Sequence, residues 1–307
     1  MITDIYLDNH LNIACAIGHA AVHRWNAGPA PCDTQPMPIH STTMELAAVL
    51  AIALYFSAAA ALARPLLNQG AIARRAGLAF GTIAVLLHFA VLFGIHRGAV
   101  DLHFYAALSL VSAVIAALTL IVNVARPVAA LGIILFPLAG LFLAIDEFLA
   151  PPTAPFPLDW QIGLHVIIAL LAYSLLAIAA VLALLLATQE KALRTRTLNA
   201  WADALPPLTQ TESLMFKLIG AGFALLTLTL LSGILFVHNL HAQHQAHTAI
   251  LSLVAWIIFG VLLIGRWRWG WRGRRAVNLT IAGMAILLLA FFGSKFVLEM
   301  ILHRKGM

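Results

Sequence analysis

Histidine is the residue type in this chain that is best suited to ligand chemistry, and its distribution is uneven. A neutral imidazole is a common ligand of metal ions and of haem iron. Of the 13 histidines, four fall within the first 43 residues and nine follow. Eight of these nine lie at or near the ends of long apolar runs, and one lies inside such a run. The nine are His88, His96, His103, His165, His238, His241, His244, His247 and His303.

The apolar runs decide which elements must position these side chains. Hydrophobic residues make up 62% of the 307-residue chain, charged residues make up only 10%, and the mean hydropathy is +0.96. Soluble domains contain about 45–50% apolar and about 25% charged residues. The composition therefore indicates an integral membrane protein. It argues against a soluble enzyme, a nucleic-acid-binding protein and a disordered chain.

Eight runs are long enough to cross a bilayer, which takes about 20 mostly apolar residues in a helix. We therefore predict an all-α, polytopic integral membrane protein with eight transmembrane helices. The predicted spans are residues 44–63, 77–95, 104–124, 128–149, 162–187, 214–237, 248–265 and 276–301.

The charges between the spans predict the orientation of the helices. Alternate gaps together hold twelve Lys and Arg residues, whereas the other gaps hold only Arg97. Since Lys and Arg accumulate on the cytoplasmic side, both termini are predicted to lie outside. Eight of the nine histidines then lie at the outer face. A ligand role for some of them and a plain interfacial role for all of them both fit this placement.

The most basic gap, residues 266–275, combines five arginines with Trp267, Trp269 and Trp271. Such interleaving is typical of a lipid headgroup interface on the cytoplasmic side. A docking site for a cytoplasmic partner is the alternative.

Residues 1–43 differ from the rest of the chain. They contain four prolines and both cysteines, Cys15 and Cys32. We expect this segment to be a disordered tail or an over-extended start, and residues 44–307 to form a single eight-helix domain. The two cysteines could pair in an oxidising compartment.

Individual histidines differ in what their surroundings suggest. His88 lies inside the second span, where an ionisable group is a candidate for function. The alternative for His88 is a neutral ring hydrogen-bonded to a neighbouring helix. His165 opens the fifth span, just after Trp160. The four histidines from His238 to His247 recur every three residues, which fits either a metal site or a solvated loop.

Short motifs in the second half of the chain are specific in combination. They are Leu164-His165-Val166, Ala172-Tyr173, Leu205-Pro206-Pro207-Leu208, Gly220-Ala221-Gly222-Phe223, Leu231-Ser232-Gly233, Gly270-Trp271-Arg272-Gly273-Arg274-Arg275 and Phe292-Gly293. On these motifs the chain resembles the cytochrome c assembly superfamily, the haem-handling membrane proteins of the CcsA and CcmC type. With His238-Asn239-Leu240 and Gly293-Ser294-Lys295-Phe296-Val297, it looks most similar to the YpjD-like inner-membrane branch.

The resemblance implies a haem site on the outer face between two histidines. By position, His165 matches the first of these and His303 the second. His247 or His238 is the substitute for His303, and His88 corresponds to a further intramembrane histidine. The family's tryptophan-rich segment is expected between spans six and seven, but that gap reads HNLHAQHQAH and contains no Trp. This departure weakens the expectation that haem is presented to an apocytochrome.

We therefore expect haem binding or handling in cytochrome biogenesis, by a multi-pass protein of the bacterial inner membrane. The expected cofactor is haem, and the expected partners are the lipid bilayer and another membrane protein. Enzymatic activity, a catalytic residue and a metal other than haem iron are not expected. The alternative is an accessory or regulatory subunit of another membrane protein, such as a magnesium-efflux system, without haem.

Overall fold

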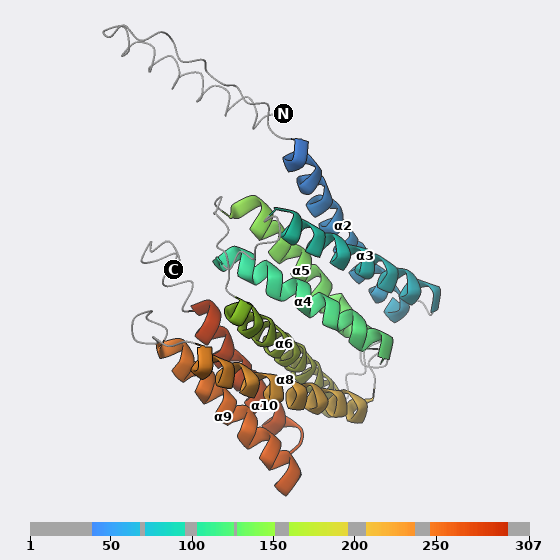
Figure 1. The fold of residues 1–307 in the computed structure, drawn as a ribbon. Coiled ribbons are helices and arrows are strands. Elements are labelled where there is room, and N and C mark those ends of the chain that lie inside the picture. Colours follow the sequence, from blue (N-terminus) through green and yellow to red (C-terminus); the bar gives the residue numbers. More distant parts are fainter. Residues whose placement is uncertain are drawn as a thin grey trace, which may run out of the picture. The chain divides into compact units, whose positions relative to one another are not determined.

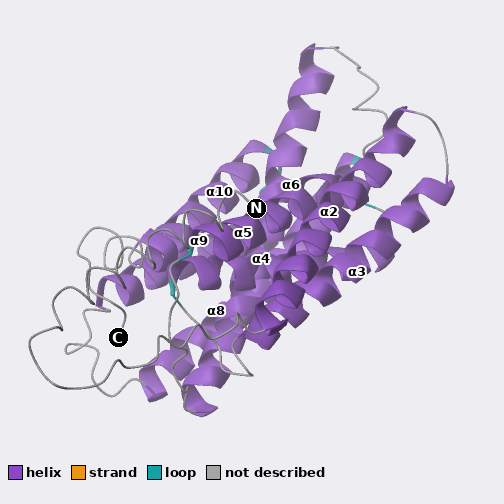
Figure 2. Cartoon of the chain, turned by 90° about the horizontal axis from the view of Figure 1, so that it is seen from above, coloured by secondary structure: helices purple, strands orange, loops and turns teal. Residues whose placement is uncertain are grey.

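The structure is a computed structural model that describes residues 39–67, 71–95, 103–125, 128–150, 160–195, 207–236 and 246–293. The chain divides into two units, Met1–Thr42 and Thr43–Met307, and the description below concerns the second. The expected tail, residues 1–43, lies outside the described residues except for its last five. Every regular element in the described part is a helix (Figure 1, Figure 2).

The helices follow the apolar runs closely. They are α2 (Ile39–Leu67), α3 (Ala71–Ile95), α4 (Phe104–Ala125), α5 (Ala129–Leu149), α6 (Trp160–Thr195), α8 (Leu208–Phe236), α9 (Ala246–Trp269), α10 (Arg274–Leu288) and the π-helical turn η1 (Leu289–Gly293). Among the described residues, eight helices are long and apolar enough to cross a membrane. The predicted all-α fold with eight such helices is confirmed, while the orientation of the termini stays a prediction.

Several helices extend beyond the apolar runs. α6 continues through a polar segment to Thr195, where Glu190 and Arg194 approach to 3.7 Å across one turn. α8 begins at Leu208, and its first turn is closed by the amide of Gln210, which donates to the Pro207 carbonyl at 2.9 Å. Hydropathy marks the buried length of a helix, so it missed these polar ends. The last predicted span is described only as far as Gly293.

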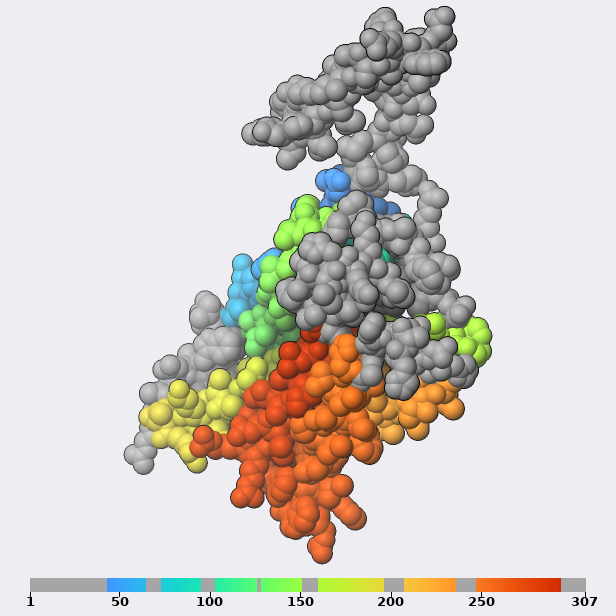
Figure 3. All heavy atoms as spheres, turned by 90° about the vertical axis from the view of Figure 1, so that its left-hand side faces the viewer, coloured from blue at the N-terminus to red at the C-terminus, as the bar shows by residue number. Residues whose placement is uncertain are grey.

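The helices pack in two groups that meet at α4 and α6. Figure 1 shows α2 to α5 side by side in one group, and α6 with α8, α9 and α10 in the other. α6 packs along α8 and also contacts α4, α5 and α10. Figure 3 shows α9 in orange and α10 in red on one face of this unit. Many large apolar side chains remain exposed on these helices, among them Ile257 and Ile264, as expected where lipid covers them.

Small residues let α6 and α8 approach closely. A Cβ built on Gly222 of α8 would lie 2.7 Å from Cγ of Leu176 on α6, which is too close for any larger residue without movement. About ten residues further along α8, Ser232 contacts His165 of α6. The two helices are therefore antiparallel, and their close contact brings the beginning of α6 to the end of α8.

Candidate functional site

His165 lies in the second turn of α6 and faces the end of α8. Its Nδ1 atom is 2.8 Å from Oγ of Ser232. The ring also lies beside Gly233, where a Cβ would stand 3.5 Å from Cε1 of His165. The side chain is partly buried. One nitrogen of the ring is therefore fixed to the neighbouring helix.

Ser232, the hydrogen-bond partner of His165, makes a further hydrogen bond within α8. Ser232 is only 8% exposed, and its hydroxyl donates to the carbonyl oxygen of Thr229 at 3.0 Å. Within the described residues, no hydrogen bond to Nε2 of His165 is found. Among the described residues, only the Nδ1 atom of His165 therefore has a hydrogen-bond partner.

His88 is bonded differently. It lies on α3 and is 0% exposed, and its two partners lie on other helices of the first group. Its Nδ1 atom is 3.2 Å from the hydroxyl of Tyr55 on α2, and its Nε2 atom is 3.0 Å from Oγ of Ser109 on α4. The rings of Tyr55 and His88 meet edge to face at 5.8 Å. Both ring nitrogens are engaged, so in this arrangement neither is free to bind a metal.

The remaining candidate histidines are not brought to His165 by any hydrogen bond in the described part. His247 is exposed at the second position of α9. His238 and His303 lie outside the described residues. Among the described residues, no group of three or more His, Cys, Asp and Glu side chains is arranged to hold a metal ion.

The opposite end of the second helix group carries a buried carboxylate bound by two arginines. Glu212, near the start of α8, accepts hydrogen bonds from Arg272 at 2.8 Å and from Arg266 at 3.1 Å. The hydrogen bonds and the charge of Glu212 raise the pKa of the Arg272 guanidinium. The Arg266 guanidinium also donates to the Trp271 carbonyl at 3.2 Å and lies 4.6 Å from the ring centre of Phe216. These contacts tie the loop between α9 and α10 to α8.

The shape of this loop depends on two glycines. Gly270 and Gly273 adopt φ angles of +63° and +57°, which residues other than glycine rarely adopt. At the end of α9, Trp267 is 88% exposed and Trp269 is 65% exposed. Two of the five arginines in the predicted headgroup interface thus serve an internal ion pair, and contact of the loop with lipid stays a prediction.

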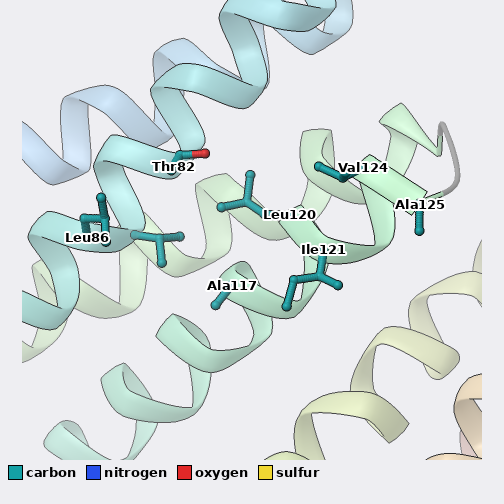
Figure 4. Close-up of a pocket in the computed structure, with 8 residues that line it drawn as sticks. Thr82, Leu86, Ala117, Leu120, Ile121, Val124 and Ala125 are labelled. Carbon is teal, nitrogen blue, oxygen red and sulfur yellow. The ribbon is translucent and has the colours of Figure 1, made fainter.

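An apolar pocket of about 530 Å³ lies between α3 and α4 (Figure 4). It has no titratable side chain in its lining, so it offers no ligand for a metal. The lining residues are Thr82, Val85, Leu86, Ala117, Leu120, Ile121, Val124 and Ala125.

Comparison with known proteins decides the family. The model of a family described as Cytochrome C assembly protein matches residues 76–302, which is most of the chain. The chain belongs to the cytochrome c assembly protein family. The match covers His88, His165 and all helices from α3 to η1 apart from the first five residues of α3.

Several known proteins are similar to part of this chain. It is 43% identical over 137 residues to inner membrane protein YpjD of Escherichia coli strain K12, covering 45% of this chain and 52% of the relative. An uncharacterized 28.8 kDa protein of Azospirillum brasilense is 34% identical over 143 residues, covering 46% and 53%. The cytochrome c biogenesis protein CcsA of Prochlorococcus marinus strain MIT 9303 is 28% identical over 107 residues, covering 34% and 32%.

The matched regions cover only part of each relative. They span about half the length of the first two relatives. No solved structure gives a significant match. The predicted resemblance to the cytochrome c assembly family and its YpjD-like branch is confirmed, and the chain is a multi-pass membrane protein.

Both histidine sites are completed by residues whose roles the sequence did not reveal. Ser232 belonged to a quoted motif, but its role required the antiparallel pairing of α6 and α8. Tyr55 lies 33 positions before His88 and Ser109 lies 21 positions after it, so no local pattern joins them. Glu212 stood outside the predicted spans, and nothing in its neighbours marked it as the partner of Arg266 and Arg272.

Proposed function

We propose that this chain binds haem through His165 and handles it in cytochrome biogenesis, as a protein of the bacterial inner membrane with both termini outside. The observation that supports the proposal is the hydrogen bonding of the His165 ring. Its Nδ1 is anchored on Ser232, and its Nε2 has no hydrogen-bond partner among the described residues. Membership of the cytochrome c assembly family supports the choice of haem.

The donor set fits haem iron. Haem, if bound, would supply an iron centre that imidazole nitrogens can ligate. His165 offers such a nitrogen near the end of a membrane helix, partly buried and held in orientation. His303 is the proposed second ligand, with His247 or His238 as the substitute. This is binding chemistry, and we propose no catalytic residue and no enzymatic step.

The role of His88 in this proposal is secondary. Both of its ring nitrogens are used by Tyr55 and Ser109, so ligation of iron by His88 would require one of these bonds to break. We therefore assign the haem to His165 first.

An absorption spectrum tests the proposal directly. Protein purified from haem-replete membranes should show a Soret band, and His165→Ala should weaken the band or shift it. His103→Ala, just before α4 and outside the proposed ligand set, is the matched control. An unchanged spectrum in His165→Ala would leave haem binding intact and contradict the assignment of His165.

A second function is favoured by one observation. The gap between α8 and α9 contains no tryptophan, although the family's haem-presenting segment is expected there. Without a Soret band in the wild-type protein, we would replace the haem proposal by an accessory or regulatory subunit of another membrane protein, such as a magnesium-efflux system.

A further inference from the structure

The contacts of Ser232 determine which nitrogen of His165 carries the proton. A neutral imidazole has one N–H donor and one lone-pair nitrogen, and the partners of the ring select between the two tautomers. Nδ1 of His165 lies 2.8 Å from Oγ of Ser232, so one of these two atoms must donate to the other. The second contact of the serine decides which one does.

The Ser232 hydroxyl has a single proton. Its oxygen is 3.0 Å from the carbonyl oxygen of Thr229 in the preceding turn of α8, in a geometry that suits donation to this carbonyl. If the proton were directed at His165 instead, two oxygen atoms with only lone pairs between them would face each other at 3.0 Å in a buried place. Such a contact between two lone pairs is repulsive, and little water is present to relieve it.

Both contacts become hydrogen bonds in only one arrangement. In it, Nδ1–H of His165 donates to Ser232, and Ser232 donates to the carbonyl of Thr229. The proton of the neutral ring is then on Nδ1, and Nε2 carries the lone pair. Because Ser232 is only 8% exposed, water has little access to compete for either bond.

We propose that Ser232 is a positioning residue, which holds His165 in the Nδ1-protonated tautomer and so presents Nε2 to a metal centre. The identity of that centre as haem iron rests on the proposed function, whereas the tautomer is a property of the chain itself. Metal-binding histidines generally donate their second N–H to a neighbouring acceptor, which fixes the ring and raises its basicity. Ser232 supplies this acceptor from the adjacent helix.

Nitrogen NMR of the haem-free protein tests the tautomer. The full chain, labelled with ¹⁵N-histidine, would be measured in lipid bilayers, with His165→Gln used to assign the signal of His165. The wild type should show a protonated Nδ1 and an unprotonated Nε2. Ser232→Ala should lose this preference, and Ser232→Thr should keep it, because a threonine hydroxyl also bonds to carbonyls of the preceding turn.

Ser109→Ala is the matched control, since it removes a serine partner from His88. It should change the signals of His88 and leave those of His165 unmoved. A protonated Nε2 in wild-type His165, or the same tautomer in Ser232→Ala, would overturn the positioning role.

Titration with haem separates this inference from the proposed function. Ser232→Ala should bind haem about tenfold to a hundredfold more weakly than wild type, which is the usual range for loss of an outer partner. Ser232→Thr should restore most of the affinity. A wild type with the Nδ1 tautomer and no haem binding would contradict the proposed function alone. Haem binding by a wild type with the opposite tautomer would contradict the positioning role alone.

Discussion

Two histidine sites in the described part of the chain use the same side chain in opposite ways. His88 is fully buried between α2, α3 and α4, and both of its nitrogens have hydroxyl partners on other helices. His165 lies between α6 and α8, and only its Nδ1 has a partner among the described residues. The first site joins three helices, whereas in the second we propose that one nitrogen serves a ligand.

This difference shows that depth alone is a poor guide to function in a membrane helix. An ionisable residue within a span is a candidate for function by default, and His88 is the deeper of the two. Its hydrogen bonds are saturated within the protein, however, which is how a polar side chain stabilises a helix bundle. The number of unengaged ring nitrogens separates the two sites better than burial does.

The largest expected effect concerns the side of the membrane on which His165 lies. Reporter fusions after Arg75, Arg196 and Arg275 should report the cytoplasm, and fusions after Thr153 and Gln245 should report the outer side, because the basic gaps remain cytoplasmic. Each fusion reports either one side of the membrane or the other, so the expected difference in reporter signal is complete. A cytoplasmic signal at Gln245 would remove the reason for placing a haem site at that end of α6.

The next effect separates the two histidines by stability. His88→Ala should lower the free energy of unfolding by about 2–4 kcal/mol, because it opens a cavity and leaves two hydroxyl groups without their partner. His165→Ala should cost less than about 1 kcal/mol, close to the value of one interhelical hydrogen bond in a membrane protein. Unfolding in mixed detergent micelles measures both. Equal losses would contradict the assignment of a structural role to His88 alone.

The close contact that supports the His165 site can be tested with two glycines of α8. Gly222→Ala should destabilise the protein by about 1–3 kcal/mol, because its Cβ would overlap Leu176 and push α8 away from α6. Gly220→Ala is the matched control, since nothing lies within 4 Å of its added Cβ. Thermal unfolding of the two variants gives the comparison. A Gly222→Ala protein as stable as the Gly220→Ala protein would show that the helices do not depend on this approach.

The smallest effect on stability is expected for Tyr55, a hydrogen-bond partner of His88. Tyr55→Phe removes one hydroxyl and keeps the aromatic ring, so it should cost about 0.6 kcal/mol, the average for such a bond between membrane helices. The same unfolding experiment measures it. A loss as large as that of His88→Ala would mean that Ser109 contributes little to holding His88.

The sequence predicted the helices well and the sites only in part. Apolar length predicted the eight helices, because a membrane span must satisfy its own backbone. The polar ends of α6 and α8 were missed, because hydropathy does not detect ion pairs such as Glu190 with Arg194 or the turn at Pro207. His88 and His165 were found as residues, but their difference depends on partners that packing brings from other helices.

The same limit applies to the basic end of the molecule. Five arginines and three tryptophans in residues 266–275 predicted a headgroup interface. The structure shows in addition that Arg266 and Arg272 form ion pairs with Glu212 of another helix, and contact of the loop with lipid stays a prediction. The charge pattern predicted a basic loop, whereas the tertiary contacts show which of its arginines form ion pairs within the protein.

The contrast between the two histidines is tested most directly by the haem content of two matched variants. His165→Gln and His88→Gln would be purified alongside the wild type from haem-replete membranes, glutamine being chosen because its amide can replace one of the hydrogen bonds of a histidine. The account predicts that His165→Gln lowers haem affinity at least about tenfold, while His88→Gln keeps the wild-type Soret band. Loss of haem in His88→Gln with retention in His165→Gln would contradict it.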